Sequence, residues 1–139
     1  MYAYVAPFRN QAKRVAWEYL KYYTSPIPSR TVNESELYIE LPSRHARSPG
    51  ARLYIIGADH PDALRGIYLD GVILDEYADI KPELWDGVIR SVLSDRAGWA
   101  VFIHAEGTES VLRDVPTRGE IGGLVLLHLQ IGRDGSAPR

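Results

Sequence analysis

Val72-Ile73-Leu74 is a short, fully apolar run that is followed at once by two carboxylates, Asp75 and Glu76. A strand that is apolar on both sides belongs in the interior of a parallel sheet, where other layers cover both faces. Such a sheet needs crossover connections, which are usually helices. This run therefore constrains the chain to an α/β arrangement with Asp75 and Glu76 at the end of a central strand.

The rest of the chain supplies matching elements. Short β-prone runs predict strands over residues 2–6, 36–41, 52–56, 99–103 and 124–129. Apolar residues recur at helical spacing over residues 8–23 and 82–93, and Pro82 is well placed as a first helical residue. The polar, turn-rich connector 42–50 predicts a hairpin with a basic loop. The alternation predicts an α/β fold with a mostly parallel sheet flanked by helices.

Composition excludes several classes of protein. With 139 residues the chain fits one domain, and a net charge of −2 gives no general reason to bind nucleic acid or membranes. The absence of cysteine excludes disulfides and thiolate metal sites, and fits a reducing cytoplasm. No apolar run approaches the roughly 20 residues that a membrane-spanning helix needs. The first residues, from Met1 to Tyr4, lack the pattern of a signal peptide.

Charge is unevenly distributed along the chain. Residues 1–30 are basic, with Glu18 as their single acid, whereas residues 59–86 are strongly acidic and contain only Arg65 and Lys81 as bases. An acidic cluster beside a strand indicates a metal- or phosphate-handling edge. A solvated acidic surface is the alternative that the sequence leaves open.

An apolar strand that ends in adjacent carboxylates is the Walker B arrangement of P-loop ATPases. In open α/β sheets, ligands bind outside the carboxyl ends of the strands. Asp75 would then hold Mg²⁺, because a hard cation prefers oxygen ligands. Glu76 would orient and polarise the water that attacks the γ-phosphate. A plain strand end without chemistry remains open from these residues alone.

The flanking sequence is more specific. Residues 57–66 read Gly-Ala-Asp-His-Pro-Asp-Ala-Leu-Arg-Gly, and residues 68–79 read Tyr-Leu-Asp-Gly-Val-Ile-Leu-Asp-Glu-Tyr-Ala-Asp. Together with Tyr4-Val5-Ala6-Pro7, Gln11-Ala12-Lys13 and the aromatic strand 99–103, this stretch resembles the ATPase domain of phage and prophage terminase large subunits. The resemblance runs in one order from about residue 2 to residue 103. It implies a fragment of a P-loop, ASCE-type ATPase fold.

The resemblance also implies a function. In this family ATP hydrolysis with Mg²⁺ drives translocation of viral DNA into the procapsid. It implies a catalytic Glu76, a Mg²⁺-binding Asp75, and a phosphate or carboxylate contact for Arg65, for which a surface ion pair is the structural alternative. The implied partners are double-stranded DNA, the portal protein, the small terminase subunit and further copies in a ring, in the cytoplasm of a bacterial host and away from membranes.

Two departures from the family pattern bear on activity. The sequence contains no G-x-x-x-x-G-K-[ST] loop, which cradles the β- and γ-phosphates in P-loop enzymes. The family's Gly-Thr-Pro-type coupling loop is also replaced by His104-Ala105-Glu106-Gly107-Thr108, and no nuclease domain follows. We therefore interpret residues 1–103 as a partial ATPase domain without a Walker A loop, and we expect this polypeptide alone to be inactive.

Residues 104–139 contain no aromatic residue, although aromatic residues make up 10% of the chain. Suitable synonymous codons for His104–Val125, read one nucleotide later, encode TPKGRNQFYEMYQRAEKSEDW, which opens with the missing coupling loop and restores aromatic residues. Loss of two bases after the Ile103 codon is sufficient to cause this change. We hypothesise that residues 104–139 are an aberrant, frameshifted and poorly structured tail.

Two other interpretations remain. A helicase-like DExx ATPase fragment also carries Asp-Glu after an apolar strand, but the flanking stretch of residues 57–79 does not resemble one. A non-enzymatic α/β interaction module would have the same fold, with the acidic residues as a solvated face only.

Overall fold

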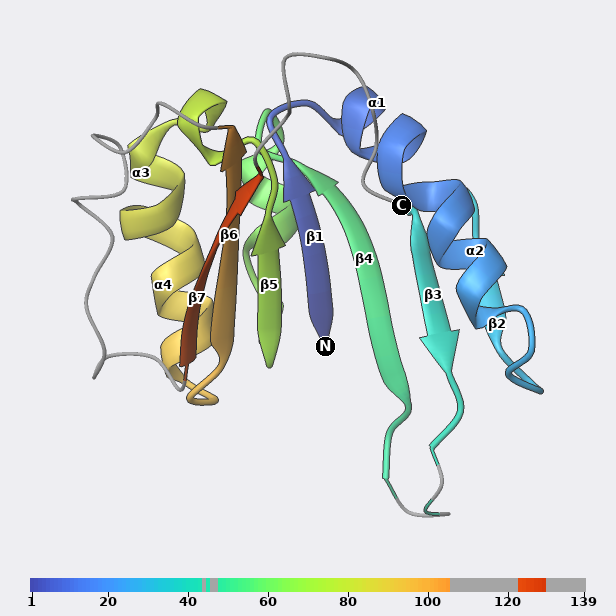
Figure 1. Cartoon of the computed structure of the whole chain (residues 1–139). Coiled ribbons are helices and arrows are strands. Elements are labelled where there is room, and N and C mark those ends of the chain that lie inside the picture. Colours follow the sequence, from blue (N-terminus) through green and yellow to red (C-terminus); the bar gives the residue numbers. More distant parts are fainter. Residues whose placement is uncertain (44, 46–47, 106–122, 130–139) are drawn as a thin grey trace.

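The computed structural model describes residues 1–43, 45, 48–105 and 123–129. They form a seven-stranded sheet in the order β2-β3-β4-β1-β5-β6-β7, with β1 in the interior (Figure 1). Neighbouring strands from β4 to β7 are parallel, and the hairpin strands β2 and β3 are antiparallel. The strands are β1 (Tyr2–Ala6), β2 (Thr31–Asn33), β3 (Tyr38–Leu41), β4 (Ala51–Gly57), β5 (Gly71–Leu74), β6 (Trp99–Ala105) and β7 (Gly123–Leu129).

Two helical segments connect these strands. The first consists of α1 (Arg9–Ala12), the π-helical η1 (Lys13–Trp17) and α2 (Glu18–Thr24); the second consists of α3 (Pro82–Leu84), the π-helical η4 (Trp85–Ile89) and α4 (Arg90–Ser94). Short 3₁₀ turns, η2 (Pro61–Leu64) and η3 (Tyr77–Asp79), flank β5. Within the described ranges, no helix combines the length and the apolar character needed to cross a membrane.

The larger hydrophobic core lies between the sheet and helix α3–η4–α4. Val72 and Leu74 of β5 point into it and are fully buried. The Phe102 ring of β6 meets the rings of Tyr77 and Trp85 edge-on, at centroid distances of 4.7 and 4.9 Å. Edge-to-face packing of this kind adds to the gain from burial. This core fixes the position of β5 and of the chain that follows it.

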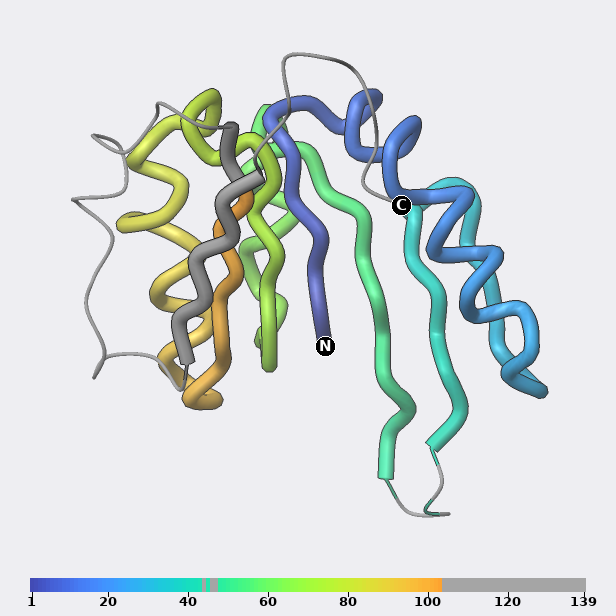
Figure 2. Tube along the Cα trace, viewed as in Figure 1, coloured from blue at the N-terminus to red at the C-terminus, as the bar shows by residue number. Residues whose placement is uncertain are grey.

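A smaller core lies on the opposite face of the sheet, under helix α1–η1–α2. Trp17 of η1 is buried there with Ala12, against Ile39 of β3 and Ile55 of β4. The first helix therefore covers the β3–β4 side of the sheet. Figure 2 shows it beside β4 and β3, while β1 begins in the middle of the sheet, between β4 and β5.

The predicted α/β class and mostly parallel sheet are confirmed, with helices at 9–24 and 82–94 close to the predicted ranges. Three expectations need correction. The short strand β2 was not predicted. Ile73 is only partly buried, although its neighbours Val72 and Leu74 are fully buried. The third difference explains the second. The first helix was expected to cover the sheet, but it packs over β3 and β4 and leaves the same face of β5 open.

The tail contributes one described element. Strand β7 pairs in parallel with β6 along its whole length, for example Ile103 with Leu127, in agreement with the strand expected over 124–129. The remainder of the predicted aberrant tail, residues 106–122 and 130–139, lies outside the described residues. The hypothesis of a shifted reading frame stays a prediction.

Candidate functional site at the carboxyl ends of β1 and β5

Asp75 lies directly beyond β5, at the carboxyl edge of the sheet. Leu74 is in register with Val5 of β1, and the Asp75 N–H still donates to the Val5 carbonyl at 2.8 Å. The strand pairing thus extends one residue past β5 and fixes the Asp75 backbone. Its carboxylate is presented at the edge where open α/β sheets bind ligands.

Glu76 adopts a left-handed backbone conformation, with φ 48° and ψ 46°. Left-handed geometry costs a residue other than glycine roughly 1–2 kcal/mol. The turn is held by the Asp79 N–H, which donates to the Glu76 carbonyl at 2.9 Å, and by the Glu76 N–H, which donates to Asp75 Oδ1 at 3.0 Å. The chain therefore turns sharply immediately after the strand, at the second of the two carboxylates.

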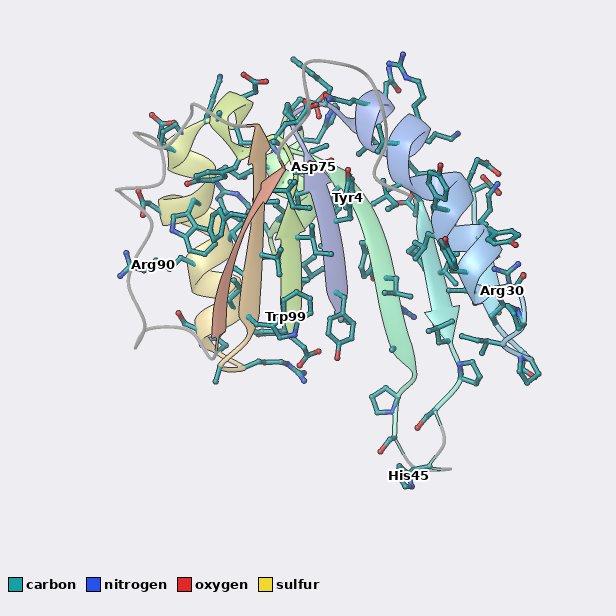
Figure 3. All side chains as sticks on the ribbon, in the orientation of Figure 1. Tyr4, Arg30, His45, Asp75, Arg90 and Trp99 are labelled. Carbon is teal, nitrogen blue, oxygen red and sulfur yellow. The ribbon has the colours of Figure 1, made fainter. Side chains whose placement is uncertain are left out.

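Tyr4 of β1 is a direct partner of Asp75. Its hydroxyl donates a hydrogen bond to Asp75 Oδ2, and Figure 3 shows the two side chains side by side near the top of the sheet. Burial raises the pKa of Tyr4 well above its usual range, and the hydrogen bond to Asp75 raises it further. Tyr4 therefore remains a neutral donor at physiological pH and holds the Asp75 carboxylate in one orientation.

Gln11 of α1 is the hydrogen-bond donor that contacts the Glu76 carboxylate. Its side-chain Nε2 donates to Glu76 Oε2 at 2.5 Å. An amide donor adds no charge, so the bond orients the carboxylate without a competing cation. Both carboxylates are thus held by neutral donors from the β1–α1 unit.

Arg65 follows η2, and its guanidinium Nε lies 3.1 Å from Asp62 Oδ1, one helical turn earlier. The side chain is 70% exposed. This is the surface ion pair that the sequence left open as the structural alternative. An exposed pair of this kind contributes little to stability and leaves the guanidinium accessible. The predicted phosphate or carboxylate contact of Arg65 stays a prediction.

The acids of residues 59–86 do not gather at one point. Asp70 lies at the opposite end of β5, where it pairs with the N-terminal ammonium of Met1 and lies 3.6 Å from Arg96. Asp86 is paired with Arg90 on the second helix. Across the described part of the chain, no group of three or more histidine or acidic side chains is arranged to hold a metal ion. The acids of this segment are thus distributed over both ends of β5 and the second helix.

Gly57 and Asp59 position the first helix. The Asp59 carboxylate accepts a hydrogen bond from the Arg9 N–H at 3.0 Å, at the start of α1, as an N-terminal cap supplied from another element. Gly57 allows this approach, because a Cβ at Gly57 would overlap the backbone nitrogen of Arg9. These two residues bring α1, and Gln11 with it, to the carboxyl edge.

A polar depression lies beside the site. It has a volume of about 740 Å³ and is lined by residues of the first helix and of the turn after β4, among them Arg9, Gln11, Arg14 and Asp59. Gln11 lines the depression and donates a hydrogen bond to Glu76. The depression brings two cationic side chains to the edge that carries the carboxylates.

Tyr4 and Gln11 were not predicted as site residues. Both lie within the stretch that carries the family resemblance, but sequence reasoning assigned them only to a strand and a helix. One signal was available for Tyr4, since a tyrosine inside a buried strand needs a partner for its hydroxyl. No comparable signal exists for Gln11, because its partner depends on how the first helix is placed on the sheet.

Comparisons with known proteins identify relatives of part of this chain. No family model matches the chain. The terminase large subunits of Thermus phage G20c and Thermus virus P23-45 are each 44% identical over 66 residues, covering 43% of this chain. The alignment covers 14% of each of those proteins, so the chain is short relative to its curated relatives.

Solved structures extend the likeness to most of the chain. The large terminase ATPase domain of Thermus phage P74-26 matches 91% of this chain and 62% of its own, with 25% identity and a TM-score of 0.64. The large terminase of another thermophilic bacteriophage matches in fold, with 16% identity, a TM-score of 0.62, and coverage of 91% of this chain and 32% of its own. Structures of that second protein in complex with ATP-γ-S and with ADP also match. In sequence and in fold, the chain is therefore similar to the ATPase domain of phage terminase large subunits, of which it spans a part.

Proposed function

We propose that this chain provides the Walker B edge of an ATP-hydrolysing site in a motor that packages viral DNA. The observation that carries the proposal is the pair Asp75 and Glu76 at the carboxyl end of β5. Each carboxylate is held by a separate neutral donor, Tyr4 and Gln11 respectively. Such fixed positioning is what phosphoryl transfer requires from a protein, because catalysis rests on orientation and electrostatics.

The donor set fits Mg²⁺. A carboxylate oxygen has two acceptor sites, so Asp75 keeps free lone pairs after accepting from Tyr4 and from the Glu76 N–H. Bound there, Mg²⁺ would neutralise charge on phosphate oxygens. Glu76 would accept a hydrogen bond from a water and orient it. Gln11 keeps the Glu76 carboxylate in place for that role.

Two further observations support a nucleotide site. The polar depression beside Glu76 offers Arg9 and Arg14 as positive charges at the same edge. The large terminase of a thermophilic bacteriophage, which shares the fold, has been solved with ATP-γ-S and with ADP. We extend the proposal to the family's work, in which hydrolysis drives double-stranded DNA into the procapsid by a ring of subunits that contacts a portal and a small subunit.

The metal part of the proposal can be tested without turnover. Mn²⁺ added to ¹⁵N-labelled protein broadens the amide signals of nearby residues even when binding is weak. We expect selective broadening at Asp75, Glu76 and their neighbours on β1. Asp75→Asn should remove it. Asp86→Asn is the matched control, because Asp86 is an exposed acid on the second helix, and it should leave the broadening at Asp75 unchanged.

Broadening that is equal at Asp75 and at exposed acids such as Asp86 would contradict the proposed metal site. Tyr4→Phe gives a finer test, since it removes the hydrogen bond to Asp75 and little else. We expect it to weaken Mn²⁺ binding about 3- to 10-fold, in line with the loss of one orienting partner of a metal ligand. An unchanged affinity would show that Tyr4 has no positioning role.

A further inference from the structure

The polar depression beside Glu76 is one of two openings that lie next to the candidate site. It is lined by residues of the first helix and of the turn after β4, among them Arg9, Gln11 and Arg14. Most of the side chains that line it are exposed, so the depression is open to solvent. Gln11 belongs to both the depression and the site, because its Nε2 donates to the Glu76 carboxylate.

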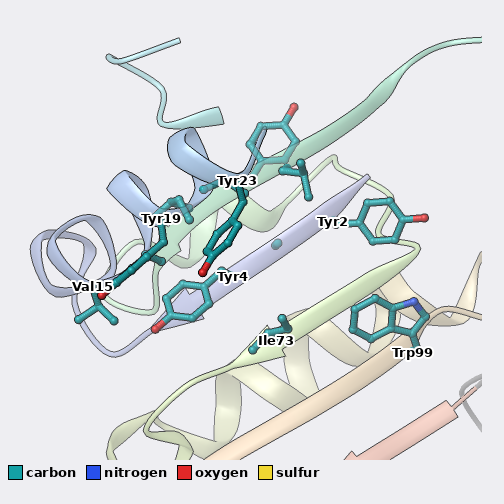
Figure 4. A pocket seen from close by; sticks show the side chains of 13 residues that line it. Tyr2, Tyr4, Val15, Tyr19, Tyr23, Ile73 and Trp99 are labelled. Carbon is teal, nitrogen blue, oxygen red and sulfur yellow. The ribbon is translucent and has the colours of Figure 1, made fainter. Parts of the chain in front are cut away.

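The second opening is an apolar groove of about 660 Å³ between the first helix and the sheet. Figure 4 shows Tyr4 and Val15 toward one end of this groove and Trp99 at the other. Among the described residues, no charged side chain lines it. An anion that entered it would lose hydration without gaining a charged partner, which is costly. Of the two openings, the depression with Arg9 and Arg14 is therefore the one that suits an anion.

The two arginines of the depression differ in what holds them. Arg9 Nη2 donates to the Ser35 carbonyl at 2.6 Å, which fixes that guanidinium. Arg14 is exposed and forms no ion pair within the described part of the chain. Asp59 is the single acid that lines the depression, and its Oδ1 already accepts from the Arg9 N–H at 3.0 Å and lies 3.2 Å from His60 Nδ1. The Arg14 guanidinium thus keeps its donors for a phosphate, a group whose geometry it matches.

The proposed hydrolysis sends its product toward the depression. In phosphoryl transfer the attacking and leaving oxygens lie roughly in line, so a water oriented by Glu76 lies opposite ADP. The water oxygen bonds to the γ-phosphorus, the bond to the bridging oxygen breaks, and its electron pair stays with ADP. The water keeps one proton in the hydrogen phosphate and releases the other to solvent. Inversion at phosphorus moves the remaining oxygens away from ADP and toward Glu76.

We propose that the polar depression is an exit site for this product, in which hydrogen phosphate passes Glu76 and Gln11 and binds Arg14, with Arg9 beside it. The inference rests on the proposed function, because it requires hydrolysis at Glu76. It adds a second ligand, inorganic phosphate, on the side of Glu76 that faces away from the nucleotide. Phosphate can leave by this route while ADP stays bound.

The test uses inorganic phosphate alone, without metal or nucleotide. Spectra of ¹⁵N-labelled protein are recorded during a phosphate titration at constant ionic strength, with sodium chloride as the replacement salt. We expect saturable shifts of the Arg14 Nε–H signal and of the Gln11 side-chain amide, and none from chloride. Arg14→Gln, followed at the Gln11 amide, should weaken phosphate binding about 3- to 10-fold, because it removes a charged donor at an exposed position.

Lys13→Gln is the matched control. Lys13 precedes Arg14 on the same helix and is exposed, but it does not line the depression. This variant should bind phosphate like the unchanged chain. Equal weakening by both substitutions, or shifts that never saturate, would assign the effect to the general charge of the helix and overturn the proposal. A parallel titration with ADP separates the two sources of a phosphate group, since tighter binding of ADP than of phosphate at Arg14 would assign the depression to the nucleotide.

The phosphate test and the metal test fail separately. Broadening by Mn²⁺ at Asp75 without phosphate binding at Arg14 removes the exit site and leaves the proposed function in place. Phosphate binding at Arg14 without a metal site at Asp75 leaves an anion site and removes both the proposed hydrolysis and the exit role.

Discussion

Glu76 is the proposed water-orienting residue, and its backbone adopts a left-handed conformation that is unfavourable for residues other than glycine. A left-handed φ of 48° suits glycine, yet the proposed role requires a carboxylate at this position. Strain of this kind persists where the surrounding structure determines the conformation and function requires the side chain. The strand pairing of Asp75 with Val5 and the turn at Tyr77–Asp79 supply that constraint.

This strain can be measured by substitution. We expect Glu76→Gly to be more stable than Glu76→Ala by about 1 kcal/mol, because both lose the carboxylate but only glycine adopts the left-handed turn without cost. Urea unfolding of the two variants measures the difference. Equal midpoints would show that the turn carries no strain.

A pair of glycines tests how closely the first helix approaches β4. Gly57→Ala should destabilise the fold by about 1–3 kcal/mol, because the new Cβ would overlap the backbone of Arg9 and the Asp59 carboxylate. Gly87→Ala is the matched control, since nothing lies within 4 Å of a Cβ at this helical position. It should stabilise the fold by about 0.5–1 kcal/mol. Thermal unfolding of both variants measures the contrast, and a tolerated Gly57→Ala would refute the tight junction.

At the scale of elements, Glu34 fastens the β2–β3 hairpin to the first helix. Its carboxylate accepts hydrogen bonds from the Trp17 indole at 2.8 Å and from Lys21 at 3.1 Å. The Trp17 bond, followed by that of Lys21, holds the pKa of Glu34 below its ordinary value of 4.5. A lowered folded-state pKa gives stability that is present above the ordinary value and is lost as the pH falls through the folded value.

Glu34→Gln should therefore lower the melting temperature at neutral pH. The difference from the unchanged chain should shrink as the pH falls below 4.5 and vanish once Glu34 is protonated in both states. Melting curves recorded from neutral to strongly acidic pH measure it. A difference that persists at the lowest pH would assign the effect to packing instead of ionisation.

Sequence predicted the elements with strong local signals and missed what depends on their packing. The apolar run at Val72–Leu74 and the helical stripes fix strand and helix without knowledge of the fold. Asp75 and Glu76 were predicted as site residues because they come directly after an apolar strand. The uncovered side of Ile73, in contrast, depends on which strands the first helix covers. The bonds from Tyr4 and Gln11 depend on the register of β1 with β5, which no local pattern contains.

At the scale of the whole molecule, the tail gives the sharpest prediction. If residues 104–139 are a shifted reading of the family's downstream segment, the gene must contain codons that yield that segment one nucleotide later. Sequencing the DNA decides this directly. Codons for His104–Val125 that cannot encode the shifted string would refute the hypothesis.

Truncation after Ile103 tests the same hypothesis in the protein. It removes the last two residues of β6 and the whole of β7, which pairs along β6. A tail that was never selected to pack should be removable, with cooperative unfolding of residues 2–103 retained. Circular dichroism during thermal unfolding measures this. Loss of the cooperative transition would show that β7 belongs to the fold.

The position of β1 has a consequence for how the chain acquires its structure. Among the described strands β1 is synthesised first, yet it lies inside the sheet, and its partners are distant in sequence, since Tyr2 is in register with Leu53 on one side and with Gly71 on the other. Contacts across such separations slow folding, because a long loop must close before they form. During synthesis β1 therefore waits unpaired until β4 and then β5 have been added, and an apolar strand in that state is prone to aggregate. The centre of the sheet therefore forms its strand pairs late, although β1 is synthesised before the strands on either side of it.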